Sequence, residues 1–489
     1  MNSANQPARP PSLPPLSRRA FFHSAVAGAA GAVSAAQLSG CASLPAAGAA
    51  GAGRFREAPR DLPHRQDADV IVCGAGPAGV AAAIAAARAG ARTRLFDRHG
   101  CLGGVWTAGL LTYIFDFDKP GLTRELVRKL DARDARRNQN LSRFVYDPEA
   151  MKLILEELCA EASVNLQLHT AVTAAYCTGR RLTAVVTESK SGREAWGAPV
   201  FIDATGDGDL GAQAGCGWDF GNEADGTSQP LTLNALAVVR DVEALAEYIS
   251  FYKNNDGRHI ESVEAFKKEL KRAGIETSYG HPTLFHIREN LLDVMINHEY
   301  GVKPYNAAQL TEATVRARAE VHRAVAALRA LGGPWAGMQV VATAEQIGIR
   351  DGRRIHGRYT VTRNDLLTGA RHPDAVARAT FNVDIHAADK KKNDAETISH
   401  GGFKTKPYDI PLRALIAKDV DGLLMAGRCI SGDFIAHASY RVTGNSVATG
   451  EAAGLVAALA ATSGRRPHEV EWTETKTALS AWNARTPCL

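Results

Sequence analysis

The chain has eight cysteines but no C-x-x-C pair, and the cysteines are scattered from position 41 to position 488. Dithiol reductases, c-type haem, iron–sulfur clusters and structural zinc sites all need grouped thiolates. The spacing therefore argues against these redox and metal groups, and no metal site is predicted. We expect most of the cysteines to be small buried residues, and one isolated disulfide remains an alternative.

A basic stripe suited to nucleic acid is also lacking. The net charge of the 489 residues is +5, and it falls to +2 when Arg9, Arg18 and Arg19 are removed with the expected leader. The hydrophobic share of 45% and charged share of 22% are those of an ordinary globular protein. These values predict no nucleic-acid partner, and the length favours two cooperating domains plus a leader.

A long hydrophobic run is missing from the first forty residues, although they are typical of an export signal. The paired arginines in Ser17–Phe22 precede a weakly apolar Ala/Gly/Val run that extends to Leu38. This layout resembles a twin-arginine signal, and the run is too short to favour a stable membrane span. We therefore expect a signal peptide at 1–40, followed by a flexible linker at 41–66.

The sequence Leu-Ser-Gly-Cys at 38–41 resembles a lipobox. It predicts cleavage before Cys41 and a lipid anchor on that sulfur, with ordinary cleavage nearby as the alternative. The expected location is outside the cytoplasm, either periplasmic or as a membrane-anchored lipoprotein facing the periplasm.

A dinucleotide fingerprint begins after the linker. The β-formers of Asp69–Cys73 run directly into the G-x-G-x-x-G pattern at 74–79, and strong helix formers follow as far as Gly90. In this order of strand, turn and helix, Gly74 permits the tight turn, Gly76 lets the backbone approach a pyrophosphate, and Gly79 lets helix and strand pack closely. The helix start then offers its N–H groups to the phosphates.

An acidic residue stands where a ribose-binding side chain is expected. Asp97 ends the next predicted strand, 92–96, and follows Gly74 by about the 20 residues typical of this motif. Its carboxylate could accept hydrogen bonds from the ribose hydroxyls of the adenosine.

Two later segments have the form of further cofactor contacts. An apolar strand at 199–203 runs into Ala204-Thr205-Gly206, and another at 422–426 ends at Gly427. The second leads through Asp433 to a glycine-rich stretch at 443–450 and an Ala-rich helix at 451–461.

Together these pieces resemble the FAD-dependent oxidoreductase family, in the fumarate reductase-like branch of the glutathione reductase superfold. The matching segments extend from 69 to about 461 and are the glycine fingerprint with DRHGCLGG, then FIDATGDGD, IGIRDGRRIHG, FNVDIHAADK, YDIPLRALI and LLMAGRCISGDFIAHASYRVTGNSVATGEAAG. The resemblance implies an α/β fold, with a Rossmann-type, glutathione reductase-like FAD-binding domain and an inserted α+β substrate domain.

The resemblance also implies FAD as the cofactor and suggests which residues hold it. Asp433 would contact the ribityl or pyrophosphate part, and the start of the last helix would aim its positive end at the isoalloxazine carbonyl. Attachment of the flavin through His99 or Cys101 is an alternative to noncovalent binding. The expected cofactor-binding residues are Gly74, Gly76, Ala78, Gly79, Asp97, Arg98, Gly103, Gly104, Ala204, Thr205, Gly206, Asp207, Gly427, Arg428, Asp433, Gly444, Asn445 and Ser446.

The FAD-binding domain is expected to be discontinuous. Its parts would be 67–215 and 408–464, with the substrate domain at 216–407 and a C-terminal tail at 465–489 that carries no strong signal. The elements predicted within the first part are a helix from Asp147 to about Ala162 and a β-meander built from strands at 164–172 and 182–188. In the substrate domain we expect a strand at 231–239 and helices at 260–273 and 308–330.

A general base is needed if an alcohol is oxidised, because a hydroxyl proton must leave with the hydride. His386 is the main candidate, since strand alternation would put Asn382, Asp384 and His386 on one face. An acidic neighbour could then orient the imidazole, and a hydrogen-bonded structural histidine is the alternative. His298 is a weaker candidate.

Basic residues are concentrated in IRDGRRIHG at 349–357. They could bind a carboxylate or donate a proton, as arginine does in the fumarate reductase-like enzymes that the segment resembles. A helix here would put Arg350, Arg353 and Arg354 on one face, and an ion-pair network between domains is the alternative. His437, Tyr440 and Arg441 should border the flavin. The expected catalytic residues are His386, Arg354, Arg350, His356 and Arg441.

No second nucleotide fingerprint occurs between residues 100 and 400, so we expect no NAD(P)H-binding domain. Electrons would pass from the substrate to FAD and then to oxygen, a quinone or a carrier protein. The main hypothesis is a dehydrogenase or oxidase acting on a small alcohol, polyol, sugar-like or CH–CH donor. The alternatives are a fumarate reductase-like C=C reductase fed by an external carrier and a non-catalytic flavin-binding lipoprotein.

Overall fold

The computed structural model describes residues 55, 57–137, 141–254, 258–395 and 397–485. The chain divides into two units, residues 1–60 and 61–489. The expected signal peptide, Cys41 and most of the linker lie outside the described residues. In the first unit, Arg60 and Glu57 form an ion pair of 2.7 Å. All helices and strands below belong to the second unit.

A parallel five-stranded sheet forms the centre of the dinucleotide-binding region, and its order is β23-β11-β2-β3-β7. Its strands are β2 (Val70–Cys73), β3 (Thr93–Phe96), β7 (Asn165–Gln167), β11 (Val200–Asp203) and β23 (Leu423–Met425). Four of them consist wholly of buried residues, as expected for a sheet covered on both faces. All five strands come from the segments 67–215 and 408–464.

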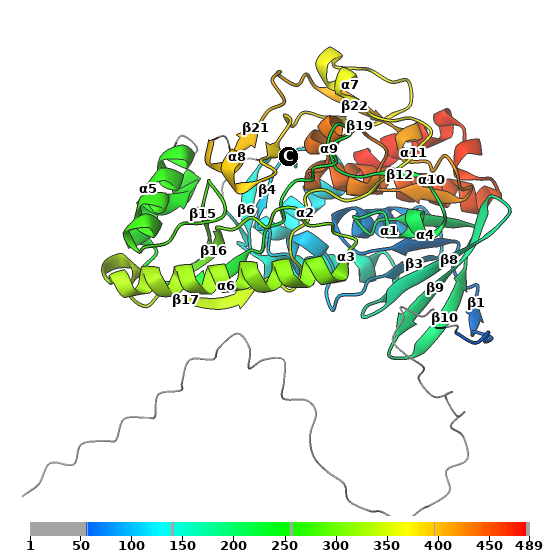
Figure 1. Ribbon diagram of the computed structural model, residues 1–489. Helices are drawn as coiled ribbons and strands as arrows, with labels where there is room; N and C mark the ends of the chain where they lie inside the picture. The colour runs from blue at the N-terminus through cyan, green and yellow to red at the C-terminus, as the bar shows by residue number, and fades with distance from the viewer. Residues whose placement is uncertain (1–54, 56, 138–140, 255–257, 396, 486–489) are drawn as a thin grey trace, which may run out of the picture. The chain divides into compact units, whose positions relative to one another are not determined.

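Two helices from distant parts of the sequence pack beside this sheet. They are α1 (Pro77–Arg88) and α10 (Thr443–Ser463), and Figure 1 shows α10 lying along α1. A Cβ on Gly450 or Gly454 would lie 2.2 Å from a carbonyl oxygen of α1, at Ala78 or Ala82. The two backbones can therefore approach this closely only because α10 carries glycine at both positions.

An antiparallel meander follows the first part of the parallel sheet. It consists of β8 (Ala171–Thr178), β9 (Arg181–Ser189) and β10 (Gly192–Gly197), and β1 (His64–Arg65) pairs with β10. The strand predicted at 164–172 is in fact two strands. His169, with a φ of 52°, lies between β7, which joins the parallel sheet, and β8, which starts the meander.

A second sheet, of order β14-β15-β16-β13-β17, lies in the inserted region 216–407. Its strands are β14 (Ile249–Ser250), β15 (Thr283–Arg288), β16 (Leu291–Met295), β13 (Ala235–Val238) and β17 (Gln339–Thr343). The predicted helices appear as α5 (His259–Arg272) and α6 (Ala307–Leu331), whereas only part of the strand predicted at 231–239 is regular. In Figure 1 this sheet and its two helices lie together, beside the region that contains α1 and α10.

Shorter elements complete the second unit. The strands are β4 (Tyr113–Ile114), β5 (Arg136–Arg137), β6 (Phe144–Tyr146), β12 (Trp218–Asp219), β18 (Arg354–Ile355), β19 (Ala375–Ala379), β20 (Ile385–His386), β21 (Ile398–Ser399) and β22 (Tyr408–Pro411). The helices are α2 (Leu122–Asp131), α3 (Pro148–Glu161), α4 (Asp209–Gln213), α7 (Arg363–Thr368), α8 (Lys390–Ala395), α9 (Phe434–Tyr440) and α11 (Trp472–Ala484).

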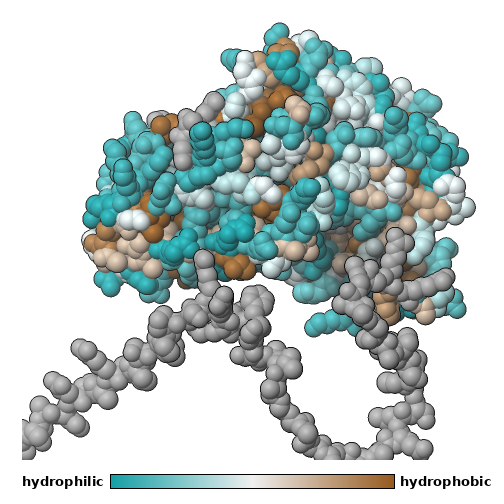
Figure 2. All heavy atoms as spheres, in the orientation of Figure 1, coloured by the Kyte–Doolittle hydropathy of each residue, from teal (hydrophilic) through white to brown (hydrophobic). Residues whose placement is uncertain are grey.

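The surface seen in Figure 2 is mainly hydrophilic, with hydrophobic residues in separate small groups. Within the described part of the chain, no helix is both long and apolar enough to cross a membrane. The six cysteines that the structure describes are all unpaired.

Candidate active site

The turn between β2 and α1 has the geometry that the fingerprint predicts. Gly74 has a φ of 96°, and a Cβ there would lie 2.6 Å from the carbonyl oxygen of Ala204. A Cβ on Gly79 would lie 1.8 Å from the carbonyl oxygen of Gly74. At Gly76, by contrast, an added Cβ meets no atom within 4 Å. The protein itself fills the space beside Gly74 and Gly79 and leaves it open beside Gly76.

Asp97 follows β3 and faces this turn. Its carboxylate accepts hydrogen bonds from the backbone N–H of Ala75 at 2.6 Å and of His99 at 2.7 Å. The side chain is also part of a cavity wall. Asp97 thus ties the second strand of the motif to the glycine turn.

The start of α10 contributes a buried amide without a partner. Thr443 and Ser446 in its first turn line the same cavity. Asn445, between them, is 1% exposed, and neither polar atom of its side chain has a hydrogen-bond partner among the described residues. Two helix N-termini, those of α1 and α10, therefore lie at one cavity, where their dipoles favour negative charge.

This cavity has a volume of about 710 Å³ and joins the glycine turn to the inserted region. The predicted cofactor-binding residues that line it are Gly74, Gly76, Ala78, Asp97, Arg98, Gly104, Ala204, Thr205, Gly206, Gly427, Arg428 and Ser446. The predicted catalytic residues that line it are His386, Arg350 and Arg441. Most of the residues expected to hold FAD thus share one cavity with three of the five expected to act in catalysis.

The remaining predicted cofactor residues do not line the cavity. Gly79 and Gly103 support the fingerprint turn, and a hydrogen bond of 2.8 Å joins the Gly103 N–H to the Ala75 carbonyl. Asp207 accepts a hydrogen bond of 3.1 Å from the guanidinium of Arg428. A Cβ on Gly444 would meet the carbonyl of Asp116, so this glycine allows α10 to start close to a neighbouring loop.

His386 is held by a carboxylate on its own segment. Its Nε2 lies 3.3 Å from the carboxylate of Asp384, and its Nδ1 has no hydrogen-bond partner among the described residues. Burial and the charge of Arg350 lower the pKa of His386 to about 4. At neutral pH the imidazole is therefore uncharged, with Nε2–H donating to Asp384 and a free lone pair on Nδ1.

Asp384 is ionised because positive charge surrounds it. Burial alone would raise its pKa, but His386, Arg441 and Arg350 together lower it far below the usual range for a carboxyl. Since His386 is neutral, the arginines are the groups that stabilise this charge. Arg441 donates a hydrogen bond of 3.0 Å to the Asp384 carboxylate and another of 3.2 Å to the side chain of Gln229.

Arg350 is the second arginine on this part of the cavity wall. It donates hydrogen bonds to the carbonyl of Pro230 at 3.1 Å and to the hydroxyl of Thr232 at 2.7 Å. Burial, and then the charge of Arg441, lower the pKa of Arg350 to about 10. Two cationic side chains and one carboxylate therefore border this end of the cavity, which leaves an excess of positive charge.

Arg354 and His356 do not line the cavity, and their segment is not a helix. Arg354 is in the short strand β18, and its buried guanidinium donates to the carbonyl of Gly432 at 2.9 Å and to Glu223 at 3.0 Å. His356 contacts Asp219 at 3.1 Å and is partly exposed. The expectation that Arg350, Arg353 and Arg354 share a helix face is wrong, and Arg354 instead ties β18 to the start of α9.

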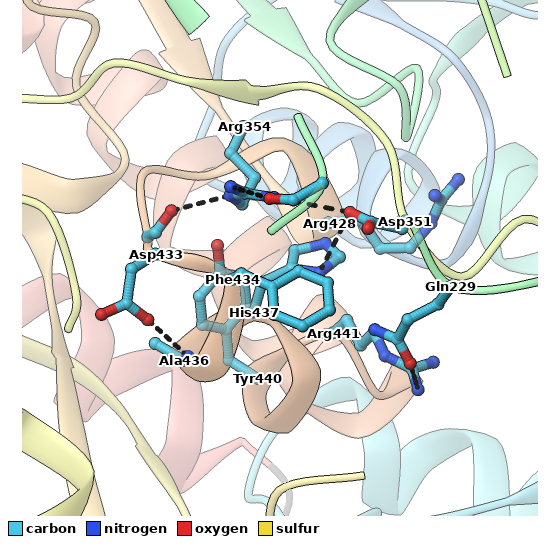
Figure 3. Close-up of polar contacts among 12 residues, drawn as sticks. Gln229, Asp351, Arg354, Arg428, Asp433, Phe434, Ala436, His437, Tyr440 and Arg441 are labelled. Carbon is cyan, nitrogen blue, oxygen red and sulfur yellow. Dashed lines mark hydrogen bonds and ion pairs between the residues drawn. The ribbon is translucent and has the colours of Figure 1, made fainter. Parts of the chain in front are cut away.

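Asp433 caps α9 and is likewise not part of the cavity wall. Its carboxylate accepts hydrogen bonds from the N–H groups of Ala436 at 2.7 Å and Arg363 at 2.6 Å. Figure 3 shows Asp433 at the beginning of α9, whereas Arg441 lies at the other end of this helix, beside Gln229. Of the residues that follow β23, the structure thus brings Arg441 rather than Asp433 to the cavity.

Two residues in and around the cavity wall, Tyr279 and Gln229, carried no signal that sequence reasoning could use, and Tyr279 is the one that lines the cavity. Tyr279 packs against His298 with a ring separation of 4.1 Å and against His386 at 5.9 Å. His298 is buried behind Tyr279 and does not line the cavity. Gln229, which connects Arg441 to the backbone N–H of His386, stands in a segment without a motif.

The fold and the cavity define an α/β protein that binds a dinucleotide beside a buried polar cluster. Its family can be stated directly, because residues 69–479 match the family described as FAD dependent oxidoreductase, and the chain belongs to this family. The protein is thus an oxidoreductase enzyme with FAD as its cofactor, and the expected α/β class with a Rossmann-type FAD-binding fold is confirmed by the family match and the parallel sheet. The open side of Gly76 and the unpartnered amide of Asn445 fit such a cofactor.

No curated protein matches the sequence. Among solved structures, the chain is similar to a geranylgeranyl bacteriochlorophyll reductase-like protein from Thermoplasma acidophilum, with 12% identity, coverage of 87% of this chain and 83% of that one, and a TM-score of 0.40. It is also similar to p-nitrophenol 4-monooxygenase PnpA from Pseudomonas putida DLL-E4, with 10% identity, coverage of 87% and 94%, and a TM-score of 0.43. A third similar structure is the flavin-dependent brominase Bmp2 in a triple mutant, with 11% identity, coverage of 85% and 84%, and a TM-score of 0.44.

Proposed function

We propose that the protein is a dehydrogenase or oxidase that transfers a hydride from a small organic alcohol to FAD, without an NAD(P)H domain of its own. The observation that carries this proposal is a neutral histidine, His386, on the wall of the cavity that also contains the glycine turn. Oxidation of an alcohol needs a group that can take a proton, and the uncharged imidazole of His386 has one ring nitrogen, Nδ1, without a hydrogen-bond partner among the described residues.

In the proposed reaction, Nδ1 of His386 accepts the hydroxyl proton of the substrate while the carbon–hydrogen bond breaks. FAD, when bound, would accept the hydride and its two electrons. The products are a carbonyl compound, reduced FAD and a protonated His386, so protons and electrons balance. Asp384 fixes the ring through Nε2–H and stabilises the imidazolium that forms, and Arg441 holds Asp384 in place.

Arg350 and Arg441 would orient the substrate in this reaction. Their excess positive charge favours an oxygen that gains negative charge as its proton leaves, or a carboxylate on the substrate. Both guanidinium groups are held by protein hydrogen bonds, so little reorganisation is needed when the substrate binds.

The test is anaerobic reduction of the bound flavin in wild type and in His386→Gln. Loss of the base should slow reduction by about 10²- to 10⁴-fold with unchanged FAD content. The wild-type rate should also be independent of pH from about 5 to 8 and fall roughly tenfold per pH unit below about 4, because protonation of His386 removes the base.

His356→Gln is the matched control, since this histidine lies outside the cavity wall. Two results would contradict the role of His386 as the base. One is flavin reduction in His386→Gln at the rate of the control, and the other is a wild-type reduction rate that already falls below about pH 6.5, the pKa of an ordinary histidine.

A C=C reductase of the fumarate reductase type is the second candidate. Arg350 favours it, because a buried arginine whose pKa falls to about 10 is a better proton donor than an exposed one. The test is whether an unsaturated carboxylate reoxidises the reduced enzyme. Reoxidation that is lost in Arg350→Lys but retained in His386→Gln would support this candidate instead. The family consists of oxidoreductases, which argues against a non-catalytic protein whose flavin is only structural.

For FAD itself, we infer that the glycine turn and the first turns of α1 and α10 bind the phosphates and the ring, and that Asp97 binds the ribose. Arg98, Ala204, Thr205, Gly206, Gly427, Arg428 and Ser446 complete this site as the cavity wall. Noncovalent binding is the simpler form, and absorbance that stays with acid-precipitated protein would instead indicate attachment at His99 or Cys101.

Export and the electron acceptor are proposals from the sequence. We propose a twin-arginine signal, cleavage before Cys41 and a lipid anchor on the periplasmic side. Labelling with a radioactive fatty acid, lost in Cys41→Ala, tests the anchor. Reoxidation of substrate-reduced enzyme by oxygen, by a soluble quinone or only by a cell extract distinguishes the three acceptors, and no nucleic-acid partner is proposed.

A further inference from the structure

Aromatic side chains form one wall of the cavity in the inserted region. Tyr113, Phe115, Phe251, Phe285 and Phe381 all line it, and they come from four separate parts of the sequence. We call these five residues the aromatic wall. None of them was singled out by a motif, because each becomes a neighbour of the others only in the folded chain.

Three rings of the aromatic wall are nearly parallel. Tyr113 stacks on Phe251 with a centroid separation of 4.9 Å and an interplanar angle of 12°, and on Phe285 at 4.9 Å and 13°. Such stacked rings at van der Waals distance form a flat, rigid apolar surface.

Phe115 is the member of the wall that lacks cover. It meets the edge of Tyr113 at 4.6 Å and tilts against Phe381 at 5.3 Å, yet it is 37% exposed. A large apolar ring on the wall of a cavity is left partly in contact with water unless a ligand covers it. The exposure of Phe115 therefore points to an apolar group of a bound molecule.

The backbone supports this placement at some conformational cost. Leu110 and Asp116, which flank the segment that contains Tyr113 and Phe115, have φ values of 51° and 53°. Positive φ is unfavourable for residues other than glycine, and it persists only where the surroundings hold it. Here the Asn234 amide donates to the Leu110 carbonyl at 3.0 Å, and the Lys119 ammonium donates to the Asp116 carboxylate at 2.6 Å.

Polar side chains also stand beside this wall, since His259 stacks on Phe251 at 4.7 Å and the Arg143 guanidinium lies over the same ring at 5.9 Å. Polarity alone therefore does not determine which ring binds here. The three parallel rings and the exposed face of Phe115 favour a planar apolar part in the substrate, and His386, Arg350 and Arg441, which line the same cavity, favour a polar part.

Resting on the function proposed above, we infer that the substrate carries a planar aromatic ring. The ring packs against the exposed face of Phe115, and the hydroxyl group that is oxidised lies on a side chain of that ring. The aromatic wall thus determines the substrate class, whereas His386 and the arginines act on the hydroxyl group.

The test compares flat and puckered rings of the same size on the oxidised holoenzyme. The probes are 2-phenylacetamide and 2-cyclohexylacetamide, which have no hydroxyl group to oxidise, and binding is followed by the change in the visible flavin spectrum. We expect the phenyl compound to bind roughly two- to tenfold more tightly, the range measured for an aromatic pair. The ratio should approach one in Phe115→Leu and also in Phe381→Leu.

Tyr176→Leu is the control, because Tyr176 is an exposed aromatic residue on β8 and is not among the residues that line the cavity. Equal binding of the two probes by wild type, or an unchanged ratio in both Phe variants, would overturn the inference. The same proteins are then mixed anaerobically with 2-phenylethanol and 2-cyclohexylethanol. If neither alcohol reduces the flavin but the phenyl probe still binds more tightly than the cyclohexyl probe, the proposed reaction is wrong and the aromatic substrate class still stands. The two failures can therefore be told apart.

Discussion

Gly76 and Gly79 stand in the same turn but face different surroundings. The position that a Cβ would take at Gly79 is occupied by the carbonyl of Gly74, whereas the one at Gly76 is open. Gly76 also has a φ of −67° and a ψ of −174°, which are accessible to any residue. The absence of a side chain at Gly76 therefore has no explanation within the described residues, and the close approach of FAD proposed above would explain it.

We expect Gly76→Ala to fold as wild type and lose FAD, and Gly79→Ala to be destabilised even without FAD. The added methyl group at Gly79 overlaps backbone atoms, which costs roughly 1–3 kcal/mol or more. Thermal unfolding of the two apoproteins, together with flavin absorbance per chain, checks both statements. A Gly76→Ala protein that retains full FAD would show that the turn does not approach the cofactor closely.

At this scale the sequence was informative where one motif determines a residue's role. Local spacing and strand order were enough to predict that the glycine turn and Asp97 lie together, and Gly74, Gly76 and Asp97 line one cavity. The roles of Arg354 and Asp433 could not be predicted in this way, because they depend on partners far away in the sequence, such as Glu223 and the backbone of Arg363.

The helix α9 illustrates how an element can explain a conspicuous residue. Asp433 is its N-cap, and this cap also accepts a hydrogen bond from the N–H of Arg363 at the start of α7. Helix capping accounts for an aspartate at this position without any contact to a cofactor.

We expect Asp433→Ala to lower the free energy of unfolding by about 1 kcal/mol, the usual cost of a lost cap, with unchanged FAD content. Urea unfolding and the ratio of flavin to protein absorbance are the measurements. Asn306→Ala is the matched control, since Asn306 caps α6 by accepting from the Gln309 N–H at 3.2 Å. Loss of FAD in Asp433→Ala, with unchanged stability, would return Asp433 to the cofactor site.

Elements with strong local patterns were predicted well. The cap at Asp147 and the helix formers after it predicted α3, and the helices α5 and α6 also appear within one or two residues of their expected bounds. The helix α11 was not predicted, because the polar sequence after 464 has no clear apolar periodicity and the helix instead buries single residues such as Thr475 and Trp482.

On the scale of the whole molecule, buried carboxyl groups link distant segments. Glu451 in α10 is fully buried and accepts a hydrogen bond from the N–H of Leu122 at the start of α2. Burial raises the pKa of Glu451 to about 7. The folded protein therefore binds this proton more tightly than the unfolded chain, in which a glutamate titrates near pH 4.3.

It follows that the contribution of Glu451 to stability is complete below pH about 4 and is lost as the pH rises through about 7. We expect wild type to lose on the order of 3 kcal/mol more than Glu451→Gln between pH 4 and pH 8. Urea unfolding of both proteins at the two pH values is the measurement, with the exposed Glu156→Gln as control. An identical pH dependence in wild type and Glu451→Gln would contradict a raised pKa.

The sequence predicted only the outline of how distant segments of the chain come together. Strand order and the glycine motifs predicted a dinucleotide-binding region made of two segments, and the parallel sheet contains strands from both. The aromatic wall and the contact between Asp384 and Arg441 could not be foreseen, because they join segments that no local pattern connects.

The contact between α1 and α10 has a consequence for biosynthesis. During translation α1 leaves the ribosome long before α10 is made, and at about 5–20 residues per second the delay is on the order of 20–70 s. Throughout that interval the Ala-rich surface that α10 later covers has no partner, and the cavity lacks the wall residues that follow β23. The nascent chain can therefore acquire its cofactor only after nearly all of it has been synthesised, which makes the supply of free FAD at that late moment a determinant of the yield of active enzyme.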